Sequence, residues 1–132
     1  RVFYSGDTGW LDEFEKIGDE YGPFDLTIIK CGAYGGGWPD IHIDGGQAVE
    51  AHVALNGRRM LPVHWLTFDL ALHPWAEPVE QAVEKADELG VEVITPKLGE
   101  LVDVGGRVQT ERWWEAMDSP IPEKETSEAP SE

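Results

Sequence analysis

Apolar residues fall into short runs that alternate with segments of helical periodicity. Residues 1–5, 24–32, 58–65 and 91–95 have the short apolar character of buried strands, and the second of these runs is rich in β-branched residues. Between them, residues 8–21, 45–55 and 79–89 repeat apolar side chains at three- and four-residue steps, which predicts helices. Strands alternating with helices indicate a layered α/β arrangement.

Capping residues set the expected limits of these helices. Thr8 is a possible N-cap of the first helix, and Gly22-Pro23 stops it. Asp44 can cap the second helix, and Gly90 ends the third. Each predicted helix therefore has a recognisable start or stop signal.

The remaining segments are less regular. Pro62 removes one ladder donor, so the third strand is expected to lie at an edge or to be irregular there. Residues 99–104 and 107–114, separated by Gly105-Gly106, predict a hairpin. Residues 119–132 form a Pro-, Ser- and Glu-rich acidic stretch with too few apolar residues to fold, so the folded domain is expected over residues 1–118.

Charge and composition limit the possible partners. The formal net charge is −16, with ten Lys and Arg among 132 residues, which argues against nucleic-acid binding and favours small molecules or cations. The single cysteine, Cys31, excludes an internal disulfide and suits a reducing compartment, so a cytoplasmic location is expected. A run long enough to span a membrane is absent from the sequence, although peripheral membrane contact and homo-oligomers stay open.

Residues with useful chemistry follow three of the predicted strands. Asp7 comes after the first strand, Gly32 and Tyr34 after the second, and His64 ends the third. In open α/β sheets functional groups collect at the carboxyl ends of strands. Asp7 is then either a helix cap or a carboxylate facing a cleft, and His64 is either a core residue or a ligand. Carboxylate oxygen and imidazole nitrogen both suit Zn²⁺.

The letters around Asp7 also fit another class. Asp-Thr-Gly, residues 7–9, is the catalytic triplet of aspartic proteases, whose small members pair two chains to supply two carboxylates. Those enzymes are all-β, whereas a helix is predicted here. Aspartic proteases also usually have an apolar residue before the Asp and Ser or Ala after the Gly, whereas this chain has Gly6 and Trp10 at these positions.

Four stretches together resemble a known family. "FYSGDTGW", "GPFDLTIIKCGAY", "DIHIDGGQAVEAH" and "LPVHWLTFDLALHPWAEP" are similar, in order and spacing, to the C-terminal half of metallo-β-lactamase-fold hydrolases. The likeness is to the branch containing N-acyl-phosphatidylethanolamine phospholipase D and covers about residues 1–100. It implies the C-terminal half of an αββα sandwich, with a mixed sheet and flanking helices.

The resemblance implies roles for individual residues. Asp7 matches a carboxylate that bridges two zinc ions, and His64 matches a ligand of the second zinc. His42 matches a histidine near the substrate, and Tyr34 lies in the segment that shapes the pocket. Apart from the resemblance, His73, before Pro74, is either an ordinary loop residue or a candidate for a supporting hydrogen bond beside the metal ligands.

This chain departs from the family pattern in two places that affect the site. Leu66 stands where relatives usually have Gly. The family's His-x-His-x-Asp-His cluster is absent, so the other zinc ligands are expected from an N-terminal half upstream of Arg1. The resemblance implies a zinc-dependent phosphodiester hydrolase, with lipids as one substrate class and a lactone as the next choice. A metal-free binding or half-domain module is the competing hypothesis, and the chain alone is expected to be inactive.

Overall fold

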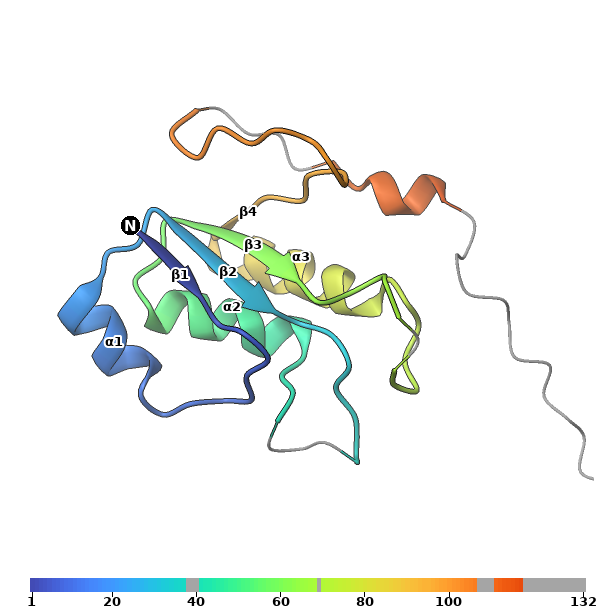
Figure 1. The fold of residues 1–132 in the computed structure, drawn as a ribbon, viewed down its shortest axis with the longest axis horizontal. Coiled ribbons are helices and arrows are strands. Elements are labelled where there is room, and N and C mark those ends of the chain that lie inside the picture. The colour runs from blue at the N-terminus through green and yellow to red at the C-terminus, as the bar shows by residue number, and fades with distance from the viewer. Residues whose placement is uncertain (38–40, 69, 107–110, 118–132) are drawn as a thin grey trace, which may run out of the picture.

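The structure, a computed structural model, describes residues 1–37, 41–68, 70–106 and 111–117. The strands β1 to β4 form a sheet in that order, and every pairing between them is parallel (Figure 1). The strands are β1 (Val2–Tyr4), β2 (Leu26–Lys30), β3 (Arg59–Val63) and β4 (Glu92–Val93). The helices are α1 (Phe14–Tyr21), α2 (Gly45–Ala54) and α3 (Glu77–Leu89), and a 3₁₀ helix, η1 (Trp113–Ala116), follows. The predicted α/β class is confirmed, and the all-β architecture of aspartic proteases is not the one observed.

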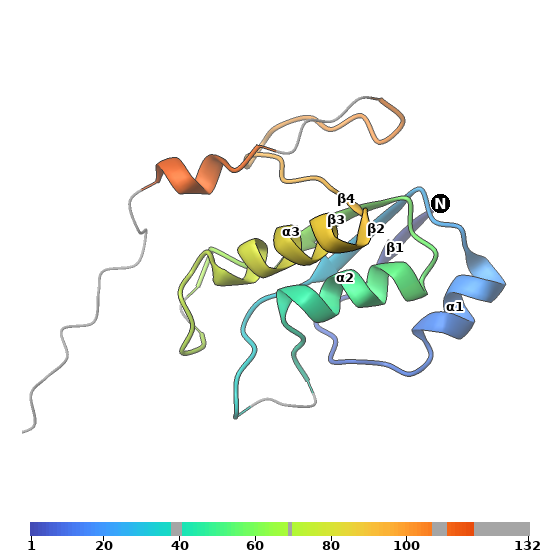
Figure 2. The ribbon, with the colours of Figure 1, turned by 180° about the vertical axis from the view of Figure 1, so that it is seen from behind.

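The helices α1, α2 and α3 all cover one face of the sheet, with α2 in the middle (Figures 1 and 2). A row of residues in register across the strands turns toward them: Phe3, Thr27, Met60 and Val93. Met60 is fully buried beneath the helices, together with the Val49 and Leu55 side chains of the α2 segment. The hydrophobic core therefore lies between the sheet and this helical layer.

The opposite face of the sheet has no described helix over it (Figures 1 and 2). Since side chains alternate along a strand, the next row in register, Tyr4, Ile28 and Leu61, points to this side. Tyr4 is 66% exposed, and Ile28 and Leu61 are half-buried. This second row is therefore an apolar surface that the described residues leave open.

The second helix starts where the sequence predicts. The Asp44 side chain accepts a hydrogen bond from the Gln47 backbone N–H at 2.8 Å, and the Gln47 side chain accepts one from the Asp44 backbone. This reciprocal capping box closes the first turn of α2. Gly90, in the left-handed region with a φ of 69°, ends α3 as predicted.

Two helix starts differ from the prediction. The first helix begins at Phe14 rather than at residue 8, because the Thr8 hydroxyl donates to the neighbouring Gly9 carbonyl instead of capping a helix. The third begins at Glu77, two residues before the predicted start, and Pro78 occupies its first turn, where a missing N–H costs nothing. The observed starts of α1 and α3 therefore differ from those predicted by apolar periodicity, because of a local hydrogen bond in one case and a proline in the other.

The predicted hairpin is wrong for the residues that the structure describes. Residues 101–106 form no strand, Trp113 and Trp114 belong to η1, and residues 107–110 lie outside the described ranges. The segment is held by side chains instead, since the Thr95 hydroxyl donates to the Glu111 carbonyl at 2.9 Å and the Trp113 indole N–H to the Thr95 carbonyl at 2.8 Å. The predicted acidic tail, residues 119–132, also lies outside the described ranges.

Pro62 lies at a local edge of the sheet, as the sequence predicts, because only β2 pairs with β3 at this position. Its strand, β3, pairs with β2 on one side and with β4 on the other, but β4 reaches only Arg59 and Met60. The Pro62 carbonyl accepts the Trp65 indole N–H at 3.1 Å. The proline is tolerated because β4 has ended before this position.

No helix within the described ranges combines the length and apolar character needed to cross a bilayer.

Candidate metal centre

Asp7 and His64 meet at the carboxyl end of the sheet. Asp7 follows β1, and His64 comes directly after β3. The Asp7 Oδ1 atom lies 3.4 Å from His64 Nε2, and the two side chains are 71% and 27% exposed. The fold therefore brings together the two residues, 57 positions apart in number, that the sequence selects as metal ligands.

The backbone around this pair is strained. His64 and Leu66 have φ angles of 67° and 76°, and Ala33, after β2, has a φ of 62°. Residues other than glycine rarely adopt this left-handed region, and such strain concentrates at functional sites. The family resemblance places Gly at the position of Leu66, so the conformation is retained here although the residue that relieves it is not.

Gly32 allows the backbone of His64 to approach β2. A Cβ atom on Gly32 would lie 2.1 Å from the His64 carbonyl oxygen, closer than any side chain permits. The backbone N–H of the preceding residue, Cys31, donates to the Val63 carbonyl at 3.0 Å. The backbone of His64 thus packs directly against Gly32, just after the end of β2.

His42 is the third residue at this edge. Its ring centroid lies 5.8 Å from that of His64, with an angle of 36° between the planes. Burial lowers the pKa of His42, the charges of Lys30 and His64 add to the lowering, and Asp7 opposes it. His42 therefore shares one electrostatic environment with the Asp7–His64 pair.

Lys30 is a further residue near this edge, and its sequence context did not single it out. It ends β2, is fully buried, and its charge acts on His42. Burial lowers the pKa of Lys30 to about 8, while Cys31 and Asp7 act in the opposite direction. The available signal was a lysine closing an otherwise apolar strand, "LTIIK", where a charged residue needs a reason.

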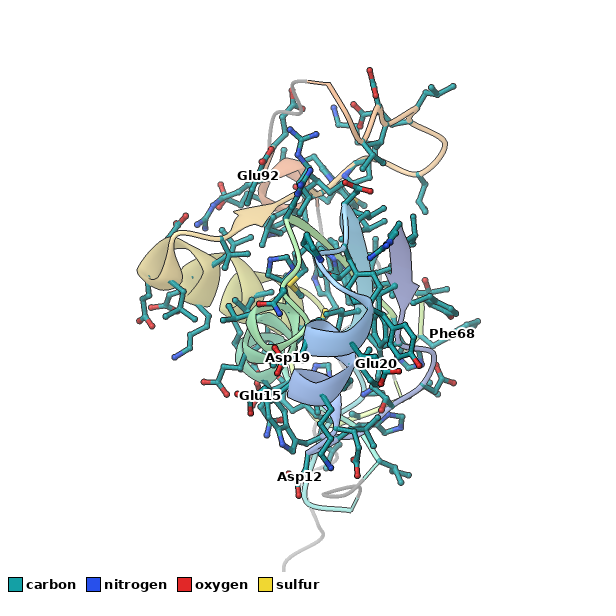
Figure 3. The ribbon with its side chains drawn as sticks, turned by 90° about the vertical axis from the view of Figure 1, so that its left-hand side faces the viewer. Asp12, Glu15, Asp19, Glu20, Phe68 and Glu92 are labelled. Atoms are coloured by element: carbon teal, nitrogen blue, oxygen red, sulfur yellow. The ribbon has the colours of Figure 1, made fainter. Side chains whose placement is uncertain are left out.

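A cavity of about 210 Å³ opens beside His64. Its walls come mainly from the segment after β3, with Ala33 opposite, and include Trp65, Leu66, Phe68, Leu70, His73 and Trp75. Phe68 lies on the side of the sheet away from α2 and α3 (Figure 3). The same view shows Glu15, Asp19 and Glu20 on α1. The cavity is lined mostly by apolar side chains.

His73 lines this cavity, and Tyr34 stacks against His73. Their rings stack with centroids 4.3 Å apart and planes 16° from parallel. The Tyr34 hydroxyl donates to the Glu77 carboxylate at the start of α3, and burial raises the pKa of Tyr34. His73 Nδ1 lies 3.0 Å from the Pro74 carbonyl. These two predicted residues thus form a second group, distinct from the group around Asp7 and His64.

A cluster of tryptophans supports the residue after His64. The Trp65 ring lies 5.6 Å from Trp113 and 5.5 Å from Trp114, measured between centroids. Trp114 is 1% exposed. Trp113 is partly buried against the same core, so both tryptophans pack inside the domain. The described end of the chain therefore holds the β3 end in place.

The donor set fits a metal site in part. Asp7 and His64 offer a carboxylate oxygen and an imidazole nitrogen side by side, which suits Zn²⁺. Among the residues that the structure describes, however, no group of three or more His, Cys, Asp or Glu side chains could hold a metal ion. These residues thus supply two ligands toward a site that needs further ligands.

Comparisons with known proteins agree with this geometry. Residues 1–65 match the family described as the beta-lactamase superfamily domain. An uncharacterized protein of Mycobacterium tuberculosis is 46% identical over 117 residues, 86% of this chain and 32% of that protein. An N-acyl-phosphatidylethanolamine-hydrolyzing phospholipase D of Caenorhabditis elegans is 34% identical over 115 residues, 81% of this chain and 32% of that protein.

Two further matches concern proteins named for a metal. A metal-dependent hydrolase of Methanocaldococcus jannaschii is 36% identical over 104 residues, 79% of this chain and 43% of that protein. A solved metallo hydrolase from Ignicoccus hospitalis shares the fold with a TM-score of 0.58 at 24% identity, over 76% of this chain and 40% of that one. This chain spans about a third of the length of the first curated relatives. The parallel sheet, the family match and these relatives place the chain in the β-lactamase superfamily, with the metallo-β-lactamase fold.

Proposed function

We propose that this chain carries two of the metal ligands of a zinc-dependent hydrolase that acts on a phosphodiester. The observation that carries the proposal is the 3.4 Å approach of Asp7 Oδ1 to His64 Nε2 at the carboxyl edge of the sheet. Relatives named as a phospholipase D and as a metal-dependent hydrolase support the substrate class and the metal. The Asp7 carboxylate and the His64 imidazole are both groups that commonly bind zinc in proteins.

Each residue at the edge has a separate task in this proposal. Asp7 and His64 would hold the metal, and the Gly32 contact and the tryptophan cluster keep His64 in place. Zinc, when bound, would supply a Lewis acid and a water of lowered pKa. His42 lies next to His64 and orients the phosphate group of the substrate.

The cavity beside His64 supports a substrate with an apolar part. Its walls include Leu66, Phe68 and Trp75, which give that side of the site an apolar lining. Tyr34 acts on this wall through His73, whose ring it stacks against, and the bond of Tyr34 to Glu77 anchors both to α3. A lipid phosphodiester has an apolar chain of the kind this cavity accepts.

We further propose that the missing ligands come from an N-terminal half upstream of Arg1. The open sheet face formed by Tyr4, Ile28 and Leu61 supports this arrangement, since an apolar sheet surface is stabilised when a second layer covers it. Residues 1–118 would then be the C-terminal part of one domain.

Zinc binding tests the proposal. Equilibrium dialysis should show weak zinc binding by the chain alone and tight binding once the upstream half is supplied. Asp7→Ala and His64→Ala should each reduce the tight affinity at least tenfold. Asp12→Ala, at an exposed carboxylate near α1 (Figure 3), is the control and should leave the affinity unchanged. Tight zinc binding that survives both ligand substitutions would contradict the assignment.

Substrate assays separate the two chemistries implied by the resemblance. The zinc-loaded protein with its upstream half should hydrolyse bis(p-nitrophenyl) phosphate, and His42→Ala should slow that reaction. Hydrolysis of a simple lactone without any phosphodiester hydrolysis would instead favour the lactonase alternative. Absence of zinc binding under all these conditions would favour the metal-free module.

A further inference from the structure

Lys30 is buried without a partner. It is 0% exposed, and its Nζ atom has no hydrogen-bond partner among the residues that the structure describes. Other lysines behave differently: Lys85 pairs with Glu50 and Glu88, and Lys97 with Glu111. A buried ammonium without a counter-charge is costly, so its presence requires an explanation.

The position of Lys30 connects it to the site. It is the last residue of β2, and its backbone N–H donates to the Ser5 hydroxyl at 3.0 Å, just before the loop that carries Asp7. Its charge acts on His42, and the Asp7 carboxylate acts on it. The Asp7 carboxylate lies 3.4 Å from His64 Nε2, and no described hydrogen bond joins it to the Lys30 Nζ atom.

The net negative charge of the chain makes a buried cation such as Lys30 important for binding an anion. The chain has 26 Asp and Glu against 10 Lys and Arg, so its overall field repels an anionic substrate. A buried positive charge at the end of β2, screened little by solvent, would offset that repulsion at the neighbouring site. Charged hydrogen bonds from an ammonium to phosphate oxygens are short and strong.

We propose that Lys30 binds a non-bridging oxygen of the substrate's phosphate group, and of the phosphate monoester product, beside Asp7 and His64. This inference rests on the proposed phosphodiester function. The lysine supplies the counter-charge for the anion, and the anion supplies the partner that the buried ammonium lacks. Because the pKa of Lys30 is about 8, the ammonium is present at pH 7.

Inorganic phosphate is the probe. Isothermal titration of the metal-free protein with phosphate should give a dissociation constant at least tenfold higher for Lys30→Met than for wild type. Lys30→Arg keeps the charge and should stay within threefold. Lys85→Met, at a partly exposed lysine on α3 with two carboxylate partners, is the matched control and should not differ from wild type.

Two further measurements separate binding from folding. Near-UV circular dichroism, dominated by the tryptophans, should be the same for Lys30→Met as for wild type, and its melting temperature without phosphate should be equal or higher, because an unpaired buried charge has been removed. Phosphate should raise the melting temperature of wild type but not of this variant. In wild type, the NMR signal of the Lys30 side-chain methylene next to Nζ should shift on phosphate addition while that of Lys85 stays fixed, which needs no variant to fold.

The outcomes distinguish this inference from the proposed function. Equal phosphate affinity for Lys30→Met and Lys85→Met, or no phosphate binding by wild type, overturns the role of Lys30 even if zinc-dependent phosphodiester hydrolysis is observed. Phosphate binding that depends on Lys30, together with no such hydrolysis by the zinc-loaded protein with its upstream half, supports the role of Lys30 and rejects the phosphodiester hydrolase.

Discussion

The core under the helices and the carboxyl edge of the same sheet treat polar groups in opposite ways. In the core, His52 and Thr27 are both buried and bonded to each other, with 2.7 Å between His52 Nδ1 and Thr27 Oγ1. At the edge, Lys30 is buried without a described partner, and His64 and Leu66 hold left-handed backbone angles. Satisfied polar groups and relaxed backbone stabilise a fold, whereas unsatisfied and strained groups at one place indicate a site.

Two histidines make the difference concrete. His52 and His64 are both single histidines in apolar surroundings in the sequence. His52 lies on α2 beneath the sheet, where burial lowers its pKa to about 4. His64 lies one residue past a strand end and faces Asp7 at 3.4 Å. Position in the sheet, rather than sequence context, separates the packing histidine from the proposed ligand.

The largest effect is expected in the core. Leu55→Ala removes a fully buried side chain after α2 and should lower the free energy of unfolding by about 2–5 kcal/mol, measured by urea melts. Val53→Ala, at a 49% exposed position of the same helix, is the control and should change it by about 0.5 kcal/mol or less. Equal losses would show that the helical layer is not the core of this chain.

Acid should act on the core through His52. Its pKa is about 4 when folded, below the ordinary 6.5, so the unfolded chain binds the proton more readily. The stability supplied by neutral His52 is complete above pH 6.5 and is lost as the pH falls toward 4, by about 3 kcal/mol. Urea melts from pH 7 to pH 4 should show a shallower decline for His52→Gln than for wild type. Parallel declines would mean that His52 is not held neutral.

Gly32 tests how closely the edge is packed. Gly32→Ala places a Cβ atom 2.1 Å from the His64 carbonyl oxygen and should cost about 1–3 kcal/mol while also weakening zinc binding. Gly35→Ala is the matched control, because a Cβ atom there meets nothing within 4 Å. Thermal melts and zinc dialysis measure both effects. A Gly32→Ala variant with wild-type stability and zinc affinity would rule out this close contact.

The smallest effect tests the strain itself. Leu66→Gly should raise the free energy of unfolding by about 1 kcal/mol, because glycine adopts the φ of 76° without a steric penalty. Leu66→Ala retains a Cβ atom and should not be more stable than wild type. If both variants gain equally in urea melts, the gain comes from the cavity wall and not from the backbone.

Local signals account for much of the fold. The apolar runs located β1 to β4, and Asp44 and Gly90 marked the start of α2 and the end of α3. Local signals failed where a competing contact won, as at Thr8, which bonds to Gly9, and at Trp114, which packs on Trp65 instead of extending a hairpin. At Thr8 the local pattern also fits a helix cap, so the sequence does not show which hydrogen bond forms. Trp65 and Trp114 are far apart in the chain, so a short window of sequence cannot show that they pack together.

By itself the sequence determined the α/β class and selected Asp7, His64, His42, Tyr34 and His73, because strand periodicity and a four-motif resemblance are properties of letters in order. Only the tertiary structure decided which of these residues lie together in space. It joined Asp7 to His64 and brought His42 beside them, whereas His73 lines the adjacent cavity and Tyr34 stacks against His73. It also buried Lys30 within range of Asp7 and His42, because burial and distance depend on how strands far apart in the chain pair and on what covers them.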